Sequence, residues 1–335
     1  MTGPEENPSR RSRATALAKR LIPWVFYVLL GAFLIAYLFT VDYDLLLSVE
    51  LNWWFMLLAT ITILVARGWA VAIWLTILRG LGAGRFSSVP TLAFVYAKSW
   101  LGRYIPGTAP WILGKIYFAS RQGLSKTKLA ISSLLEAGLQ IVVSLVIGLA
   151  MILFDPRTAV IPDEYRWLMG IAVVFGVLVL MPPVFNRILR LLFRVSKRGS
   201  LDSASLPSWN TVLAGTTMYA FVTVLAGLAA FFVTAAVWPE LSWGDAWFVI
   251  GVTSLAAAIS MLAVFAPGGI GVREAILILL LSTIMPSEIA LIATILLRLW
   301  SIVGDFLFLG ITYLVMRVAG RTPPDIPTTP LGSDA

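Results

Sequence analysis

The chain has 335 residues, of which 59% are apolar and 13% charged, and its formal net charge at pH 7 is +8. An average soluble domain carries about 25% charged residues, and a soluble fold of this length could not bury so much apolar surface, so the composition predicts a polytopic membrane protein. The absence of cysteine and histidine excludes disulfides, thiolate nucleophiles, Ser-His-Asp triads and histidine proton relays.

The N-terminal part contains a polar, basic segment, residues 1–20, followed by an apolar run from Leu21 to Thr40. This run is too long for the apolar core of a signal peptide and no small-x-small cleavage site follows it, so we interpret it as a retained first span. A second apolar run, residues 51–78, ends at Arg79 and predicts a second span.

Residues 88–121 form an interrupted apolar region. Its two apolar pieces are only about 15 and 12 residues long, too short to cross a bilayer comfortably at 1.5 Å per residue. They are separated by residues 102–110, which contain two prolines and two glycines and therefore break the helix. The pattern predicts a re-entrant helical hairpin, which is tolerated at membrane depth where it is buried in protein or lines a polar cavity.

A second interrupted region, residues 246–284, contains the sequence APGGIGVRE between Ala266 and Glu274. Residues 187–198 predict a short basic amphipathic helix that lies on an anionic membrane surface, and the Pro- and Thr-rich tail, residues 319–335, is expected to be disordered. The membrane domain therefore covers residues 21–318. Its further full-length spans are predicted at residues 127–153, 166–186, 209–238 and 288–316.

The basic residues cluster at the ends of apolar runs, which indicates membrane topology and contact with anionic lipids rather than nucleic acid binding. With six full spans and both interrupted regions re-entrant, both termini are cytoplasmic. Seventeen Lys and Arg residues then fall in inner segments, against Arg157 and Arg166 in outer loops. This positive-inside bias favours an all-α integral membrane fold of about six spans and two hairpins in the cell membrane. An alternative with eight full spans stays open on charge alone.

The two breaks have corresponding surroundings, because Pro106-Gly107 and Pro267-Gly268 lie 161 residues apart and a basic residue follows each pair. In the six-span topology the first hairpin enters from the cytoplasm and the second from outside. Span, hairpin and span then occur twice in opposite orientation. Paired Gly/Pro-interrupted segments are typical of inverted-repeat transporters, whose substrate site lies near the bilayer midplane. Two unrelated proline kinks are the plainer alternative.

At these breaks the chain resembles a known family. The residues that carry the resemblance are Gly102-Arg103-Tyr104-Ile105-Pro106-Gly107, Gly123-x-Ser125 and Glu136 in the first half, and Pro267-Gly268-Gly269-Ile270-Gly271-Val272-Arg273-Glu274 in the second. Over roughly residues 20–318 the sequence is similar to the transmembrane region of bacterial lysylphosphatidylglycerol synthases, the flippase-like integral membrane family. The resemblance implies movement of a phosphate-bearing lipid between leaflets of the cytoplasmic membrane. Because a separate soluble domain performs aminoacyl transfer in the synthases, we expect no lysyl transfer by this chain alone.

Charged side chains within membrane segments are the site candidates, because a lone charge at mid-bilayer costs at least about 2.5 kcal/mol and needs a partner, water or a route to the interface. Arg298 and Asp305 lie two turns apart in the last span, so each is expected to find a partner on another element. A polar stripe on one face of the 127–153 span either lines a headgroup path or holds the bundle together by interhelical hydrogen bonds. Its members are Ser133, Glu136, Gln140 and Ser144.

The neighbours Arg273 and Glu274 diverge by about 100° on a helix, so they cannot face the same partner. We expect Arg273 to meet Glu136 or a phosphate, and Glu274 to meet Arg298. An ion-pair lock that only fixes the hairpin is equally open for both residues.

Both breaks also carry groups that suit an anion. Glycines from Gly268 to Gly271 offer backbone N–H groups in front of a short helix, although they also allow tight packing. Arg103, beside Tyr104, is expected to hold a phosphate or to stack on the ring. The remaining basic residues of the membrane segments are expected to snorkel towards the interface; they are Arg67, Lys98 and Lys115.

The sequence thus predicts a lipid translocase rather than an enzyme, in which Arg103 and Arg273 attract the lipid phosphate and Glu136 and Glu274 neutralise these arginines when the site is empty. No ATP-binding motif is found, so transport is expected to be passive or ion-coupled. No catalytic residue, metal or cofactor is expected. The partners are membrane lipids, either anionic phospholipid or polyprenyl-linked lipid, with a separate synthase as a further option. Alternatives are a membrane enzyme or accessory subunit of lipid-linked glycan or cell-envelope lipid synthesis, and a non-transporting scaffold.

Overall fold

The computed structural model describes residues 50–322 apart from 84–85, 87, 105–109, 196–205, 264–268 and 270. Within these ranges the fold is all-helical, as predicted. The predicted first span, Leu21–Thr40, and the basic tail, residues 1–20, lie outside the described residues. So do residues 323–335 and four of the site candidates, namely Pro106, Gly107, Pro267 and Gly268.

Four long helices confirm four predicted spans: α3 (Trp53–Gly80), α6 (Lys126–Leu153), α9 (Trp209–Val237) and α12 (Ser287–Val318). Each is long and apolar enough to cross a membrane, because helices of this length rise about 40 Å or more and the hydrocarbon core is about 30 Å thick. The chain is therefore a multi-pass membrane protein. Side-chain caps fix two of the starts, since Asn52 accepts the Trp54 N–H and Ser208 accepts the Thr211 N–H.

The predicted span 166–186 is bent. The chain forms α7 (Asp163–Leu180) and then α8 (Pro182–Val195), and the two helices meet at 83°. Met181 has extended backbone angles because the ring of a following proline disfavours the helical conformation in the preceding residue. α8 provides the predicted basic amphipathic helix as far as residue 195.

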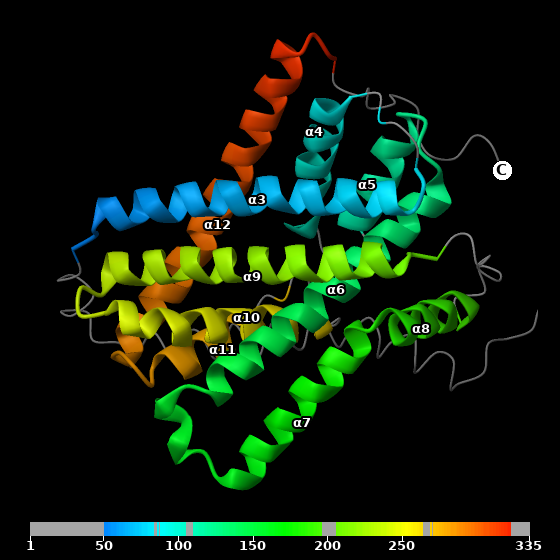
Figure 1. Cartoon of the computed structure of the whole chain (residues 1–335). Helices are drawn as coiled ribbons and strands as arrows, with labels where there is room; N and C mark the ends of the chain where they lie inside the picture. Colours follow the sequence, from blue (N-terminus) through cyan, green and yellow to red (C-terminus); the bar gives the residue numbers. More distant parts are fainter. Residues whose placement is uncertain are drawn as a thin grey trace, which may run out of the picture.

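The long helices define two ends of the bundle, which we call the Trp53 end and the Gly80 end. At the Trp53 end the Asn52 N–H donates to the Ala236 carbonyl at 2.9 Å, so the start of α3 adjoins the finish of α9. At the Gly80 end Gly80 packs against Thr211, near the start of α9. The two helices accordingly run antiparallel side by side (Figure 1).

Two helical hairpins enter the bundle from opposite ends. The first, α4 (Val89–Trp100), η1 (Leu101–Tyr104) and α5 (Pro110–Ser120), connects α3 to α6, and Lys128 Nζ donates to the Gly82 carbonyl, so both of its ends lie at the Gly80 end. The second, α10 (Ala246–Leu262) and α11 (Val272–Leu281), connects α9 to α12.

The second hairpin starts and finishes at the Trp53 end. Phe248 near its start and Leu281 at its finish share a hydrophobic cluster with Ile152, near the end of α6. The predicted inverted arrangement of two re-entrant hairpins nevertheless stays a prediction. The segment Trp243–Leu262, which comprises η4 (Trp243–Asp245) and α10, is itself long and apolar enough to span. The number of spans and the re-entrant assignment of residues 246–284 therefore stay predictions.

Small residues let the second hairpin approach α6 closely. A Cβ atom added to Gly148 would lie 2.6 Å from the backbone nitrogen of Leu255, and one added to Gly251 would lie 2.9 Å from the Cβ of Met151. Such backbone proximity is characteristic of glycine-mediated helix packing in membranes. It brings the polar stripe of α6 next to α10.

Candidate functional site

A cavity of about 180 Å³ lies between the tips of the two hairpins and the long helices. Arg67, Gln140, Thr223 and Ser301 line it, and each stands near the middle of its helix. The first hairpin contributes Arg103 and the second contributes Arg273. The cavity therefore occupies the central position that the two predicted hairpins indicate for a substrate site. Its other polar and aromatic lining residues are Tyr96, Trp100, Ser144, Tyr219, Thr253 and Ser254.

Asp305 of α12 is the counter-charge of two of the arginines. Its buried carboxylate accepts a hydrogen bond from Arg67 Nε at 2.6 Å and another from the Tyr104 hydroxyl at 2.6 Å. Arg103 Nη1 lies 3.8 Å from the same carboxylate. The expectation that Arg67 snorkels to the interface is thus wrong. Asp305 does find its partners on other elements, as predicted.

Arg103 is held loosely. Its Nη2 donates to the Ser301 hydroxyl at 3.4 Å, a long hydrogen bond. Its guanidinium stacks over the rings of Trp100, at 5.0 Å, and Tyr104, at 5.1 Å. The predicted stacking on Tyr104 is confirmed, and the weak polar contacts leave the guanidinium able to receive an anion.

Arg273 forms no ion pair with any residue that the structure describes, and its Nε atom is buried without a hydrogen-bond partner. The predicted pairing with Glu136 is therefore wrong. An unpartnered guanidinium nitrogen is costly in a low-dielectric site. Arg273 is the most conspicuous unsatisfied group facing the cavity.

Glu274, the neighbour of Arg273, is fully engaged. It accepts a hydrogen bond from Arg298 Nη1 at 2.6 Å, which confirms the predicted Glu274–Arg298 pair. It also accepts the Gly271 N–H at 2.7 Å and so caps its own helix. This N–H is thus not available to an anion, contrary to expectation. Gly269 and Gly271 have backbone φ angles of +71° and +88°, which residues other than glycine rarely adopt.

Glu136 lies behind the cavity wall rather than in it. Its carboxylate accepts the Tyr96 hydroxyl at 2.7 Å and pairs with Lys115, and both charged side chains are 1% exposed. Lys115 Nζ also stands over the rings of Trp111, Tyr96 and Trp74 at 4.4, 4.9 and 5.8 Å. The expectation that Lys115 snorkels to the interface is therefore wrong. The predicted roles of Glu136 and Glu274 as counter-charges of Arg103 and Arg273 are also wrong. Glu136 pairs with Lys115 and Glu274 with Arg298, and the carboxylate near Arg103 is that of Asp305.

The polar stripe of α6 is divided. Gln140 and Ser144 line the cavity, whereas Ser133 and Glu136 are buried outside its lining. The Ser144 and Thr223 hydroxyls are 3.4 Å apart, a weak hydrogen bond between α6 and α9. The headgroup path therefore stays a prediction for Gln140 and Ser144, whereas the contacts of Glu136 with Tyr96 and Lys115 fit the bundle-holding interpretation.

Three buried donors converge on the cavity without partners: Arg273 Nε, Trp100 Nε1 and the Thr253 hydroxyl. Trp100 and Thr253 were not predicted as site residues. Thr253 and the adjacent Ser254 interrupt an apolar run, and this interruption is the sequence signal that could have identified Thr253.

Lys98, which was expected to snorkel, places its Nζ 4.3 Å from the centre of the Phe118 ring.

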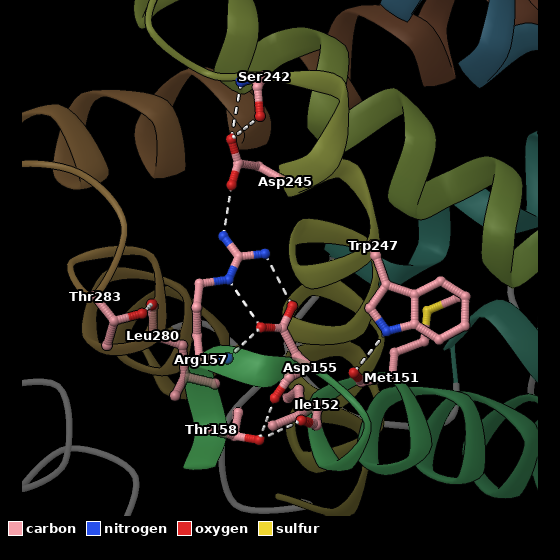
Figure 2. Close-up of polar contacts among 10 residues, drawn as sticks. All are labelled: Met151, Ile152, Asp155, Arg157, Thr158, Ser242, Asp245, Trp247, Leu280 and Thr283. Carbon is pink, nitrogen blue, oxygen red and sulfur yellow. Dashed lines mark hydrogen bonds and ion pairs between the residues drawn. The ribbon is translucent and has the colours of Figure 1, made fainter. Parts of the chain in front are cut away.

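A second polar cluster joins the α6–α7 connection to the base of α10 at the Trp53 end (Figure 2). Arg157 bonds Asp155 at 2.8 and 2.9 Å and Asp245 at 2.5 Å, and Asp245 accepts two bonds from Ser242. The bonds from Arg157 hold the pKa of Asp155 below its usual value. The pKa of Arg157 is raised by its bond to Asp155.

No group of three or more carboxylates that could hold a metal ion occurs within the described ranges. The ligand chemistry of the central cavity comes instead from guanidinium, indole, amide and hydroxyl groups, which bind anions and hydroxylated molecules.

The family model described as "Lysylphosphatidylglycerol synthase TM region" matches residues 24–308 of the chain. The matched segment includes both hairpins, the arginines of the cavity and Asp305. No curated protein matches the chain.

Proposed function

Since the chain belongs to the lysylphosphatidylglycerol synthase TM region family, we propose that it is a lipid carrier that moves a phosphate-bearing lipid between the leaflets of the cell membrane. The headgroup phosphate binds in the central cavity to Arg103 and Arg273, with Arg67 adding positive charge behind them. The single observation that carries this proposal is that three arginines line one cavity and that Arg273 has no ion-pair partner among the described residues.

The charge balance supports an anionic guest. Arg67, Arg103 and Arg273 line the cavity, whereas the nearest carboxylate, that of Asp305, pairs with the first two. The site therefore carries an excess of positive charge in a membrane interior, where an uncompensated charge is expensive and is retained chiefly for function. A phosphodiester supplies the missing negative charge and accepts several N–H bonds at once.

The loose geometry of Arg103 suggests how the guest is exchanged. Its ion pair with Asp305 is long at 3.8 Å, while Arg67 holds the same carboxylate at 2.6 Å. When a phosphate enters, Arg103 turns to it and Asp305 stays neutralised by Arg67. The guest and the carboxylate thus exchange one partner without leaving a charge unpaired. The unpartnered donors of Trp100 and Arg273 add further bonds to the phosphate.

The two hairpins provide access from the two leaflets. We place the Gly80 end in the cytoplasm because basic side chains concentrate there, in keeping with the cytoplasmic termini that the sequence predicts. Those of the Gly80 end include Arg79, Arg121, Lys126, Lys128, Arg187 and Arg190, whereas Arg157 and Arg166 belong to the Trp53 end. We propose a carrier rather than an enzyme because none of the described residues that line the cavity is a carboxylate, the commonest general acid or base available to a chain without histidine.

The proposal is tested with purified protein in vesicles that contain phosphatidylglycerol with a fluorescent acyl chain, whose appearance in the outer leaflet is followed by dithionite quenching. The wild type is expected to accelerate lipid movement over empty vesicles. Arg273→Gln is expected to slow it at least about tenfold, the effect of losing about 1.4 kcal/mol from the transition state. Arg166→Gln, the same change at an exposed arginine of α7, is the control and keeps the wild-type rate. A wild-type rate equal to that of empty vesicles, or an unimpaired Arg273→Gln variant, contradicts the proposal.

A further inference from the structure

The polar lining of the cavity comprises two chemically different sets of residues, which we call its cationic half and its neutral half. Its cationic half consists of Arg67, Arg103 and Arg273 on α3, η1 and α11. Its neutral half lies on α6, α9 and α10 and carries an amide and hydroxyl groups. The polar members of this half are Gln140, Ser144, Thr223, Thr253 and Ser254, and no aspartate or glutamate lines either half.

The neutral half can both donate and accept hydrogen bonds. The Thr253 hydroxyl is buried, in a residue that is 5% exposed, and lacks a partner. Gln140 has an amide that offers two donors and one acceptor, and the described residues give it no hydrogen bond. The Ser254 hydroxyl donates to the Ile250 carbonyl at 2.7 Å, so its oxygen remains an acceptor. Hydroxyl groups of a ligand, which also donate and accept, match this set.

The carboxylates around the cavity face away from a guest or are already paired. Asp305 is bound by Arg67 and Tyr104, and Glu274 by Arg298. Glu136 lies behind Tyr96 and pairs with Lys115, whose ammonium already occupies the aromatic cage of Trp74, Tyr96 and Trp111. An ammonium group that entered the cavity would find three guanidiniums and no free carboxylate. Repulsion between the ammonium and the guanidiniums therefore disfavours the binding of such a group.

From this arrangement we propose, on the basis of the carrier function above, that the headgroup accepted by the cavity is a phosphodiester of an uncharged, hydroxyl-bearing group such as glycerol or a sugar. The phosphate binds the cationic half and the hydroxyls bind the neutral half. Headgroups that contain an ammonium, including ethanolamine and aminoacyl esters, are rejected. The chain accordingly prefers phosphatidylglycerol to its lysyl ester, the lipid that appears in the family's description.

The first test compares headgroups on one fluorescent acyl chain in the vesicle assay. Phosphatidylglycerol is expected to move at least tenfold faster than lysylphosphatidylglycerol and phosphatidylethanolamine. A polyprenyl phosphohexose is added to the same vesicles and followed through a periodate-accessible label on its sugar. It identifies whether the hydroxylated group belongs to a phospholipid or to a polyprenyl lipid. Movement of either lipid faster than that of the two ammonium-bearing lipids supports the headgroup inference. Equal rates for all headgroups, or faster movement of the lysyl ester, overturn it while the carrier function stands.

A gain-of-function variant provides the second test. Gln140→Glu adds a carboxylate to the neutral half and is expected to raise the rate for lysylphosphatidylglycerol at least fivefold while lowering that for phosphatidylglycerol. Gln122→Glu, the same change in the turn between α5 and α6, is expected to leave both rates unchanged. A Gln140→Glu protein that is folded but gains no ammonium-lipid transport counts against the inference.

A binding measurement keeps the headgroup inference separable from the carrier function. Wild-type protein is equilibrated with equal amounts of the three phospholipids, and the lipids it retains are counted by native mass spectrometry. Retention of phosphatidylglycerol in at least tenfold excess supports the inference even if no lipid is transported, an outcome that would refute only the carrier function. Equal retention, or retention of the lysyl ester in excess, overturns the headgroup inference.

Discussion

The two hairpins enter the bundle from opposite ends and both bring basic residues to its centre, but they satisfy these charges differently. In the first hairpin Lys115 is paired with Glu136 and Arg103 approaches Asp305. In the second hairpin the carboxylate of Glu274 is used by Arg298 and by the cap of α11, and Arg273 is left with a buried, unpartnered Nε. The first hairpin is thus held to the long helices by its charges, whereas the second presents an arginine that forms no ion pair with the described residues.

This difference separates stability from binding. The side chains of Lys115 and Glu136 are fully buried and do not line the cavity, so the contribution of this ion pair is to the fold. Arg273 lines the cavity and forms no ion pair with the part of the chain that the structure describes, so we expect it to contribute little to the fold. Substitutions in the first hairpin should therefore change the free energy of unfolding, and those at Arg273 should change transport.

The largest effect on stability is expected for Lys115→Met. It leaves the Glu136 carboxylate buried with only hydroxyl partners among the described residues, those of Tyr96 and Tyr219, and breaking a buried ion pair in this way costs about 3–5 kcal/mol. The measurement is the free energy of unfolding from SDS titration of the detergent-solubilised protein.

The double variant Lys115→Met, Glu136→Gln serves as its control. Because both charges are then removed, the double variant is expected to recover much of the lost stability. If the single variant unfolds within about 1 kcal/mol of the wild type, a value typical of exposed pairs, the first hairpin is not fastened by this pair.

A smaller loss is expected for Asp305→Asn. The amide oxygen still accepts a hydrogen bond from Arg67 or Tyr104, but the two guanidiniums lose their shared counter-charge. Because their side chains are 20% and 25% exposed, water compensates in part, and the expected loss is about 1–3 kcal/mol. Asp163→Asn, at an exposed aspartate that lies 4.0 Å from Arg166, is the matched control and should stay within about 0.5 kcal/mol of the wild type. Equal losses for the two variants would show that the Asp305 carboxylate contributes no more to the free energy of unfolding than an exposed aspartate does.

Much of the helical fold was predictable from the sequence. The starts and ends of α3, α6, α9 and α12 fall within two residues of the predicted spans, because apolar runs bounded by polar residues set both. The bend at Met181 was not predicted, although the two prolines that follow it were visible. Proline indicates where a helix breaks, but the direction of the next helix depends on what it packs against.

The site was predictable only in part, because pairing depends on tertiary distances. Glu274 and Arg298 were correctly paired, since both needed a partner and lie only 24 residues apart. Arg67 and Asp305 are 238 residues apart in sequence, and nothing in the spacing distinguishes a snorkelling arginine from one paired with a distant helix. The neutral half of the cavity was largely missed because a single threonine in an apolar run is as common in helix packing as in a binding site.

The smallest effect is expected at the base of the second hairpin, where the Arg157 cluster provides the ionic contacts that Arg273 lacks at the tip. The pKa of Asp155 is lowered in the folded protein, chiefly by its bonds from Arg157. The contribution of this aspartate to stability is therefore complete above the unfolded-state pKa, near 3.9 for aspartate, and is lost as the pH falls through the lower folded-state value. Because Arg157 is 36% exposed, we expect no more than about 1 kcal/mol.

The measurement is the unfolding free energy between pH 7 and pH 3 for the wild type, Arg157→Gln and the control Arg166→Gln. Arg157→Gln should be slightly less stable at pH 7 and converge with the wild type at pH 3, because protonated aspartates no longer favour the arginine. Arg166→Gln should follow the wild type throughout, which separates the cluster from the general titration of carboxylates. If Arg157→Gln runs parallel to the wild type at every pH, the cluster does not fasten the base of the second hairpin. The second hairpin would then differ from the first along its whole length, because it would be held by its apolar faces and by the Glu274–Arg298 pair.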